Sequence, residues 1–202
     1  MTLYLETNAI VGIAADQQSD IAAAVFRGNV PILVPSCCLM ESYGAVAYKI
    51  RDLDGLVRRL GSAIHDYGRN PANATTAGYI ADLSDAQAAI ALIQNDMQVR
   101  LADCIDRLAG IHAFFDPPAR VVQRSARGPR LIDHPTDNLI AHAIVDHAQT
   151  RGDQSVFYTE DRKADSFASI VALLAAENVT LVHDFPALTA FLTASGFQYV
   201  TT

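Results

Sequence analysis

The sequence predicts an α/β protein with a central parallel β-sheet flanked by α-helices and interrupted by a helical insertion. Short apolar runs rich in β-forming residues alternate with helix-like runs near both ends of the chain, which is the pattern of a parallel sheet. Between residues 51 and about 115 no convincing strand is found. The 202 residues suffice for one domain, so we expect a single domain over 1–202 with 51–115 as the helical insertion.

The first part of the chain alternates strand, helix, strand and helix. "TLYLET" is short and apolar, as in a buried strand, and "NAIVGIAAD" then changes to a helical pattern. "SDIAAAVFRGN" predicts a second helix that ends at Gly28. "VPILVP" predicts the next strand, and Ser36 is a candidate N-cap for the helix "CCLMESYGAVAYKIR".

The middle of the chain predicts helices joined by a loop. "GRNPANATT" has loop composition. Ser84 and Gln87 have the spacing of a capping box and would open a long helix. Its apolar face is predicted from helical spacing to comprise Ile90, Ile93, Met97, Leu101, Cys104, Ile105 and Leu108.

Alternation returns in the last part of the chain. "ARVVQ" is a candidate short strand, and "PTDNLIAHAIVDHAQTRG" predicts a helix that begins near Pro135 and ends at Gly152. "SVFYTE" predicts a strand and "SFASIVALLAAENV" a helix. "TLVHDF" is the last predicted strand, and "PALTAFLTASG" the last helix, ending at Gly196.

The composition is that of a globular protein, with 50% hydrophobic and 18% charged residues. No apolar run approaches the ~20 residues that span a bilayer, and the N-terminus lacks the basic residues of a signal peptide. The sequence therefore predicts a cytoplasmic protein with no membrane partner. The three cysteines form no CxxC pair and are expected in the core, and the six histidines do not cluster at metal-ligand spacing.

Four acidic residues stand where predicted strands and helices meet: Glu6, Glu41, Asp137 and Asp161. Carboxyl ends of parallel strands share one edge of the sheet, so these side chains can converge although they are far apart in sequence. Converging carboxylates repel one another, and a hard cation such as Mg²⁺ or Mn²⁺ cancels that charge. Carboxylate-held metals commonly support phosphodiester hydrolysis.

Neighbouring acidic residues compete for two of these four places. Asp133 competes with Asp137, and Glu160 and Asp165 compete with Asp161. Asn8 is expected to brace the turn after the first strand, and Thr159 is expected either to end a strand or to bind a ligand. The segment "ARVVQRSARGPR" carries Arg120, Arg124, Arg127 and Arg130, which either contact phosphates or form a solvated loop.

The ordered set of these segments resembles the PIN-domain nucleases. "YLETNAI" is similar to the hydrophobic–D–T–N opening of that family, "LMES" to its second acidic helix position, "DNLIAHAIV" to its DxxIAA helix opening, and "YTEDRKADSF" to its T-x-D-x-x-F close. The matched segments span residues 3 to about 167. The chain departs from the pattern in having Glu6 in place of aspartate and in its long helical middle.

The resemblance implies a PIN-like fold and an Mg²⁺- or Mn²⁺-dependent endoribonuclease related to the VapC-like toxins of toxin–antitoxin pairs. Glu6, Glu41, Asp137 and Asp161 would be its catalytic metal ligands, and RNA its substrate. An antitoxin protein and a second copy of the chain are the candidate protein partners. The competing functions are a metal-dependent DNA nuclease or phosphatase, and a catalytically weak or inactive PIN-like scaffold that binds RNA or protein.

A net charge of −7 disfavours a protein that coats nucleic acid through a broad basic surface. It does not disfavour an enzyme with a small acidic metal site. The chain contains no GxSxG, P-loop or GxGxxG motif, so the sequence does not support a serine hydrolase, a nucleoside triphosphatase or a dinucleotide-binding protein.

Overall fold

A five-stranded parallel β-sheet forms the centre of the protein, with the strand order β3-β2-β1-β4-β5. The computed structural model describes residues 1–16, 25–27, 30–69, 74–128, 132, 134–161 and 168–197. The strands are β1 (Thr2–Leu5), β2 (Ile32–Pro35), β3 (Phe114–Phe115), β4 (Ser155–Tyr158) and β5 (Val179–Val182). The prediction of a parallel α/β sheet is therefore confirmed.

The helices are α1 (Thr7–Ala14), α3 (Ser36–Gly68), α4 (Ala74–Gly110), α5 (Ala119–Arg127), α6 (Pro135–Arg151), α7 (Ala168–Ala176) and α8 (Phe185–Ala194). Helix α1 packs against α3 and α4, α5 packs against α6, and α6 packs against α7. None of the helices in the described part of the chain combines the length and the hydropathy needed to cross a lipid bilayer.

The core lies around β1 and β4, the two neighbouring strands at the middle of the sheet. Every residue of both strands is buried, as expected for parallel strands covered on both faces. Their register pairs Leu3 with Val156 and Leu5 with Tyr158. The residues that follow each strand, Glu6 and Thr159, therefore lie side by side at the same edge.

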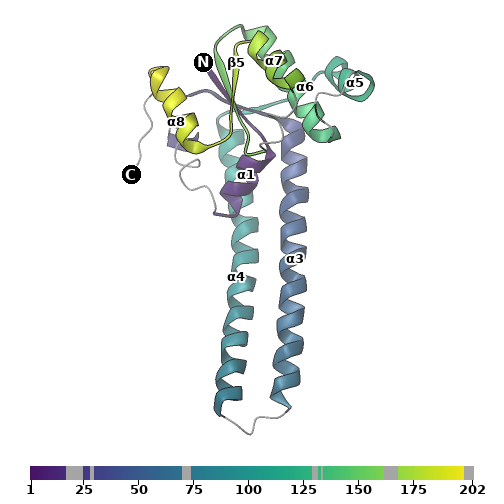
Figure 1. Cartoon of the computed structure of the whole chain (residues 1–202), viewed down its shortest axis with the longest axis vertical. Helices are drawn as coiled ribbons and strands as arrows, with labels where there is room; N and C mark the ends of the chain where they lie inside the picture. Colours follow the sequence, from purple (N-terminus) through teal and green to yellow (C-terminus); the bar gives the residue numbers. More distant parts are fainter. Residues whose placement is uncertain are drawn as a thin grey trace.

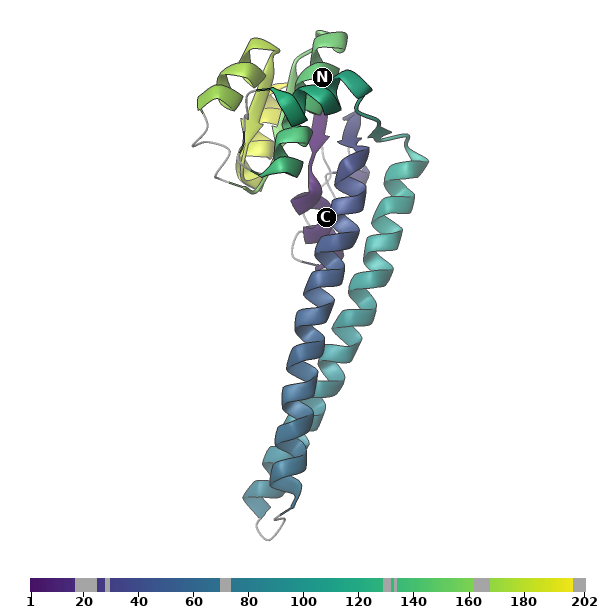
Figure 2. The same ribbon diagram turned by 90° about the vertical axis from the view of Figure 1, so that its right-hand side faces the viewer.

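A long helical hairpin extends away from the sheet (Figure 1). It consists of α3, with 33 residues, and α4, with 37 residues, and its far half stands clear of the rest of the protein (Figure 2). The helix predicted to end near Arg51 instead continues to Gly68, so the middle segment is an extension of a helix that begins at the sheet. Residues 70–73 of the predicted loop lie outside the described residues.

Several local predictions were wrong. Pro35, and not Ser36, occupies the N-cap position of α3. The capping box at Ser84 and Gln87 does not exist, because α4 begins at Ala74. There, the Ser84 hydroxyl donates to the carbonyl of Ile80, as serine often does inside a helix.

Two further predictions failed near the sheet. The segment "ARVVQ" is the start of α5 and not a strand, because Pro118 precedes it at the N-cap position and its apolar residues have helical spacing. A short strand, β3, lies at the end of the segment in which no strand was expected; it pairs Phe115 with Pro35 at the edge of the sheet. The predicted helix over 19–28 falls largely outside the described residues.

The apolar face predicted for α4 is correct near the sheet and fails farther out. Met97, Leu101, Cys104 and Leu108 are buried, whereas Ile93 is 49% exposed. Cys38 and Cys104 are buried free thiols, as expected from their predicted packing role. Helix α6 ends as predicted, at Gly152 in the left-handed conformation with φ 65°.

Candidate metal centre

The candidate site lies at the carboxyl edge of the sheet, between the ends of β1 and β4. The chain leaves β1 toward β2 and β3 on one side, and leaves β4 toward β5 on the other. This reversal of direction opens the crevice in which open α/β sheets usually bind ligands. Glu6 follows β1 at this point and Asp161 lies three residues after β4.

Glu6 is a buried carboxyl group held by neutral donors. It occupies the N-cap position of α1 but makes no cap hydrogen bond with its side chain. Instead, the Thr159 hydroxyl and the Asn8 amide both donate to its Oε1 atom, the latter over 3.0 Å. Burial raises the pKa of Glu6 to about 7, and the negative charges of Asp137 and Asp161 add to this effect.

Thr159 connects the two strand ends. Its hydroxyl donates to Glu6, and its Oγ1 accepts the backbone N–H of Asp161 over 3.0 Å. Its carbonyl accepts a hydrogen bond from His183 Nδ1 over 3.0 Å, and its N–H donates to Val182 on β5. Thr159 therefore fixes the position of Asp161 relative to Glu6, and Asn8 braces the turn as predicted.

A narrow pocket brings three of the four predicted carboxylates together. Glu6, Asp137 and Asp161 line it together with Thr159 and apolar side chains of α6 and β4. Asp137 is in the first turn of α6, where the helix dipole favours a negative charge. Of the two adjacent acidic residues after β4, the pocket contains Asp161, whereas Glu160 is exposed and accepts a hydrogen bond from Tyr158.

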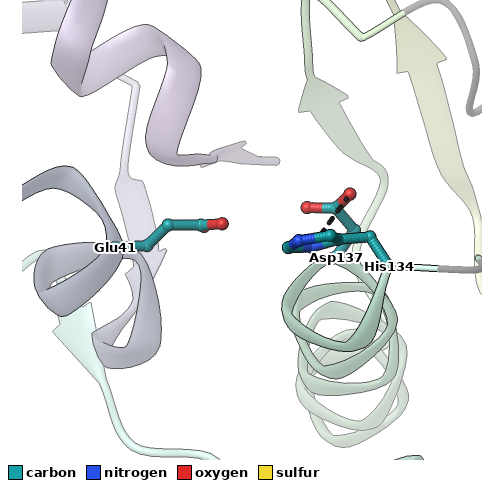
Figure 3. A group of neighbouring side chains, drawn as sticks. All are labelled: Glu41, His134 and Asp137. Carbon is teal, nitrogen blue, oxygen red and sulfur yellow. Dashed lines mark ion pairs between the residues drawn. The ribbon is translucent and has the colours of Figure 1, made fainter. Parts of the chain in front are cut away.

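Glu41, the fourth predicted residue, reaches the same region from α3. The Thr7 hydroxyl donates to its Oε2 atom, which ties the Glu41 side chain to the first residue of α1. Figure 3 shows Glu41 pointing across a gap toward Asp137 and His134 at the start of α6. One ligand atom from each of these three residues lies within 4.8 Å of the other two.

His134 and Thr7 were not predicted as site residues. His134 precedes Pro135 at the N-cap of α6, and its Nδ1 lies 3.6 Å from Asp137 Oδ2. The signal in the sequence was its spacing of three residues from Asp137, which places both on one side of a helix start. Thr7 directly follows Glu6. Asp133 and Asp165, the acidic residues that compete with Asp137 and Asp161 in the sequence, lie outside the described residues.

The buried Asn138 fixes the start of α6 relative to α5. Its amide donates to the carbonyl and the hydroxyl of Ser125 over 2.9 and 3.0 Å. Because Asn138 follows Asp137 directly, this contact places the last turn of α5 close to the site. That turn carries Arg124 and Arg127.

Arg120, at the start of α5, forms an ion pair with Asp146 and not with a residue of the candidate site. Its guanidinium makes two hydrogen bonds to the carboxylate of Asp146, over 2.6 and 3.1 Å. Arg130 lies outside the described residues. The basic segment is therefore largely helical, and within its described part Arg124 and Arg127 are the candidates for contacting a phosphate.

Comparison with known proteins identified no relative of this chain. No protein-family model matches the chain, and neither the curated proteins nor the solved structures compared with it gave a match.

Proposed function

We propose that this protein is a divalent-metal-dependent endoribonuclease with a PIN-like fold. The observation that carries the proposal is the convergence of carboxylates from four separate segments at one crevice of a parallel sheet. Glu6, Asp137 and Asp161 line one pocket, and Glu41 approaches Asp137 from the opposite side. Such convergence is costly without a cation, since like charges repel and burial disfavours the charged form.

The donor set fits Mg²⁺ or Mn²⁺. Carboxylate oxygens are the ligands these ions prefer, and Glu6, Glu41, Asp137 and Asp161 would supply them. His134 adds an imidazole nitrogen within reach of Glu41 and Asp137, a donor better suited to Mn²⁺ than to Mg²⁺. A bound divalent cation supplies Lewis-acid stabilisation of the charge that develops on a phosphate during hydrolysis.

The protein's own side chains have separate tasks under this proposal. Thr7 and Thr159 hold Glu41 and Glu6 by donated hydrogen bonds, which limits the rotamers that these carboxylates can adopt. Arg124 and Arg127 on α5 would hold phosphates of the RNA backbone next to the scissile one. These contacts are independent of base identity, so the site by itself implies no sequence preference.

The test is a cleavage assay with single-stranded RNA, single-stranded DNA and a phosphate monoester, each with Mn²⁺, Mg²⁺ or EDTA. We expect cleavage of RNA within the chain, dependent on the metal and abolished by EDTA. Cleavage of DNA or the monoester in preference to RNA would assign the same site to another reaction. Equal RNA cleavage in EDTA would refute the metal mechanism. If cleavage of cellular RNA arrests growth of the host, an antitoxin protein becomes the expected partner.

The second candidate is a scaffold that binds RNA or protein without catalysis. It is favoured by Glu6, because burial raises the pKa of its carboxyl group to about 7 and so makes a neutral, metal-free Glu6 tolerable at neutral pH. Calorimetry with Mn²⁺ distinguishes the two functions. The nuclease binds the ion through Asp137 and loses binding in Asp137→Asn, whereas a scaffold shows no such dependence.

A further inference from the structure

The far half of the helical hairpin has an apolar seam that the hairpin cannot cover by itself. Residues that are apolar, apart from two glutamines on α4, recur at alternating spacings of four and three on both helices, which is the heptad pattern of a coiled coil. On α3 these residues are Val46, Ile50, Leu53, Val57, Leu60 and Ile64, and on α4 they are Ile80, Leu83, Gln87, Ile90, Gln94 and Met97.

Burial along this seam stops abruptly. Val46 and Met97, close to the sheet, are buried, with 2% and 6% of their surfaces exposed. Beyond them, toward the tip, none of the hairpin residues that the structure describes is buried. The seam leucines and isoleucines are only half-buried there, as expected for two helices that have no further helices packed against them.

The two faces beside the seam differ in character. Each heptad has two seam positions, the second of which comes three residues after the first. In an antiparallel helix pair, the residues that directly precede the first seam position lie on the same face of both helices. On this face, called here the docking face, those positions hold Lys49, Leu56 and Ala63 of α3 and Tyr79, Ala86 and Ile93 of α4. Ile93 is 49% exposed.

The opposite face is defined by the positions that directly follow the second seam position of each heptad, which hold Asp54 and Gly61 of α3 and Ser84 and Ala91 of α4. None of these four positions holds a large apolar side chain, in contrast to Ile93 on the docking face. Within the seam, Gln94 donates to the carbonyl of Ile50 over 3.0 Å and to Asp54 over 2.8 Å, and Gln87 donates to the carbonyl of Val57 over 3.3 Å. Gly61 allows this close approach, because a Cβ there would lie 3.3 Å from the Gln87 amide.

Nearer the sheet, the docking face is covered by the protein itself. Arg100 and Arg107 continue the column of Ala86 and Ile93 at intervals of seven residues. Arg100 pairs with Asp16, just after α1, over 2.9 Å, and Arg107 lies over the ring of Phe26. Figure 2 shows α1 and the sheet on this side of the hairpin, with the lower half of the hairpin uncovered.

We propose that a second copy of this chain docks on the docking face, forming a four-helix bundle in which the two hairpin tips point in opposite directions. Because α1 and the sheet occupy the same side of each hairpin, two hairpins pointing the same way would bring their sheets into collision. In the opposite arrangement each tip extends toward the other copy's α1, and the two sheets lie at the far ends of the bundle.

The size of the face suits this occupant. Residues 50–68 of α3 extend ~28 Å at ~1.5 Å per residue, and two adjacent helices present a face ~20 Å wide. Docking would bury on the order of 1,100 Å² over both copies, which clears the ~1,000 Å² that a specific interface needs.

The experiment is the oligomeric state by light scattering over a range of protein concentrations. We expect a dimer that Ile93→Glu converts to a monomer. The matched control Ala91→Glu, an exposed position on the opposite face of the same helix, should remain dimeric.

Hydrogen exchange of the unmodified protein provides a measurement that does not depend on variants folding. Backbone amides of residues 50–68 should become more protected as concentration rises. A monomer with unprotected hairpin amides at every concentration would overturn the proposal and leave the face to a different protein. A dimer that survives Ile93→Glu would overturn it too. Neither result bears on the nuclease assay, because the docking face includes no site residue.

Discussion

Replacing Glu6 by glutamine should stabilise the metal-free protein at neutral and alkaline pH. Glu6 is 6% exposed, and burial raises its pKa from an ordinary value of 4.5 to about 7. The folded protein therefore binds this proton more tightly than the unfolded chain. The protonated Glu6 stabilises the folded state, and this contribution is complete below pH 4.5. It falls as the pH rises toward 7, since the unfolded state loses the proton first.

The magnitude follows from the change in pKa. At ~1.4 kcal/mol for each factor of ten, a pKa raised from 4.5 to about 7 corresponds to roughly 3 kcal/mol of lost stability at pH 8. Glutamine keeps an oxygen that accepts the hydrogen bonds of Thr159 and Asn8 but cannot ionise. We expect Glu6→Gln to recover up to this amount at pH 8, or about 6–12 °C in melting temperature, and nothing at pH 4.

The assay is thermal and urea unfolding of parent and variant in EDTA at pH 4, 6 and 8. The control is Glu160→Gln, which removes an exposed carboxylate just after β4, the strand next to β1, and should give no pH-dependent gain. Parallel stability–pH curves for the parent and Glu6→Gln would show that Glu6 does not ionise with a raised pKa in the folded protein. Adding Mn²⁺ should reverse the order at pH 8, because the cation stabilises only the charged form.

The remaining predictions concern the metal, the reaction and the fold. Calorimetry of Mn²⁺ binding at pH 6 in buffers of different ionisation enthalpy should show about one proton more released by the parent than by Glu6→Gln, and no difference at pH 8.5; equal release by the two proteins at pH 6 would exclude Glu6 as a ligand. Asp137→Asn and Asp161→Asn should each lower RNA cleavage at least a hundredfold with unchanged circular dichroism, whereas Glu160→Gln should cleave like the parent. Asn138→Ala should destabilise the protein by about 2 kcal/mol in urea unfolding, because it removes the hydrogen bonds from this buried side chain to the carbonyl and hydroxyl of Ser125 on α5; a loss below about 0.5 kcal/mol would show that this contact is not what holds α5.

The alternation of apolar strands and helices could be predicted because parallel strands buried on both faces are short and apolar throughout. "TLYL" and "SVFY" each form a fully buried strand at the middle of the sheet. The same logic placed Glu6 and Asp161 at one edge, since both follow the carboxyl ends of parallel strands. The strand order was decided by the fold, and only that order makes β1 and β4 neighbours.

Local patterns failed where tertiary contacts compete with them. Ser84 and Gln87 have capping-box spacing, but α4 begins ten residues earlier, and Gln87 bonds the backbone of α3 across the hairpin. "ARVVQ" has β-branched residues, yet a preceding proline and packing on α6 make it a helix. A short sequence window contains neither of these partners.

The residue types of the candidate site, the sheet class and the helical middle could be predicted from the sequence, because these follow from apolar periodicity and from the cost of placing carboxylates beside a core. The packing of distant segments was needed to show that Asp161 rather than Glu160 enters the pocket with Glu6, that His134 stands beside Asp137, and that the middle segment is a projecting hairpin. Each of these depends on distances between segments far apart in the chain, which are set by how the helices pack and which no local pattern encodes.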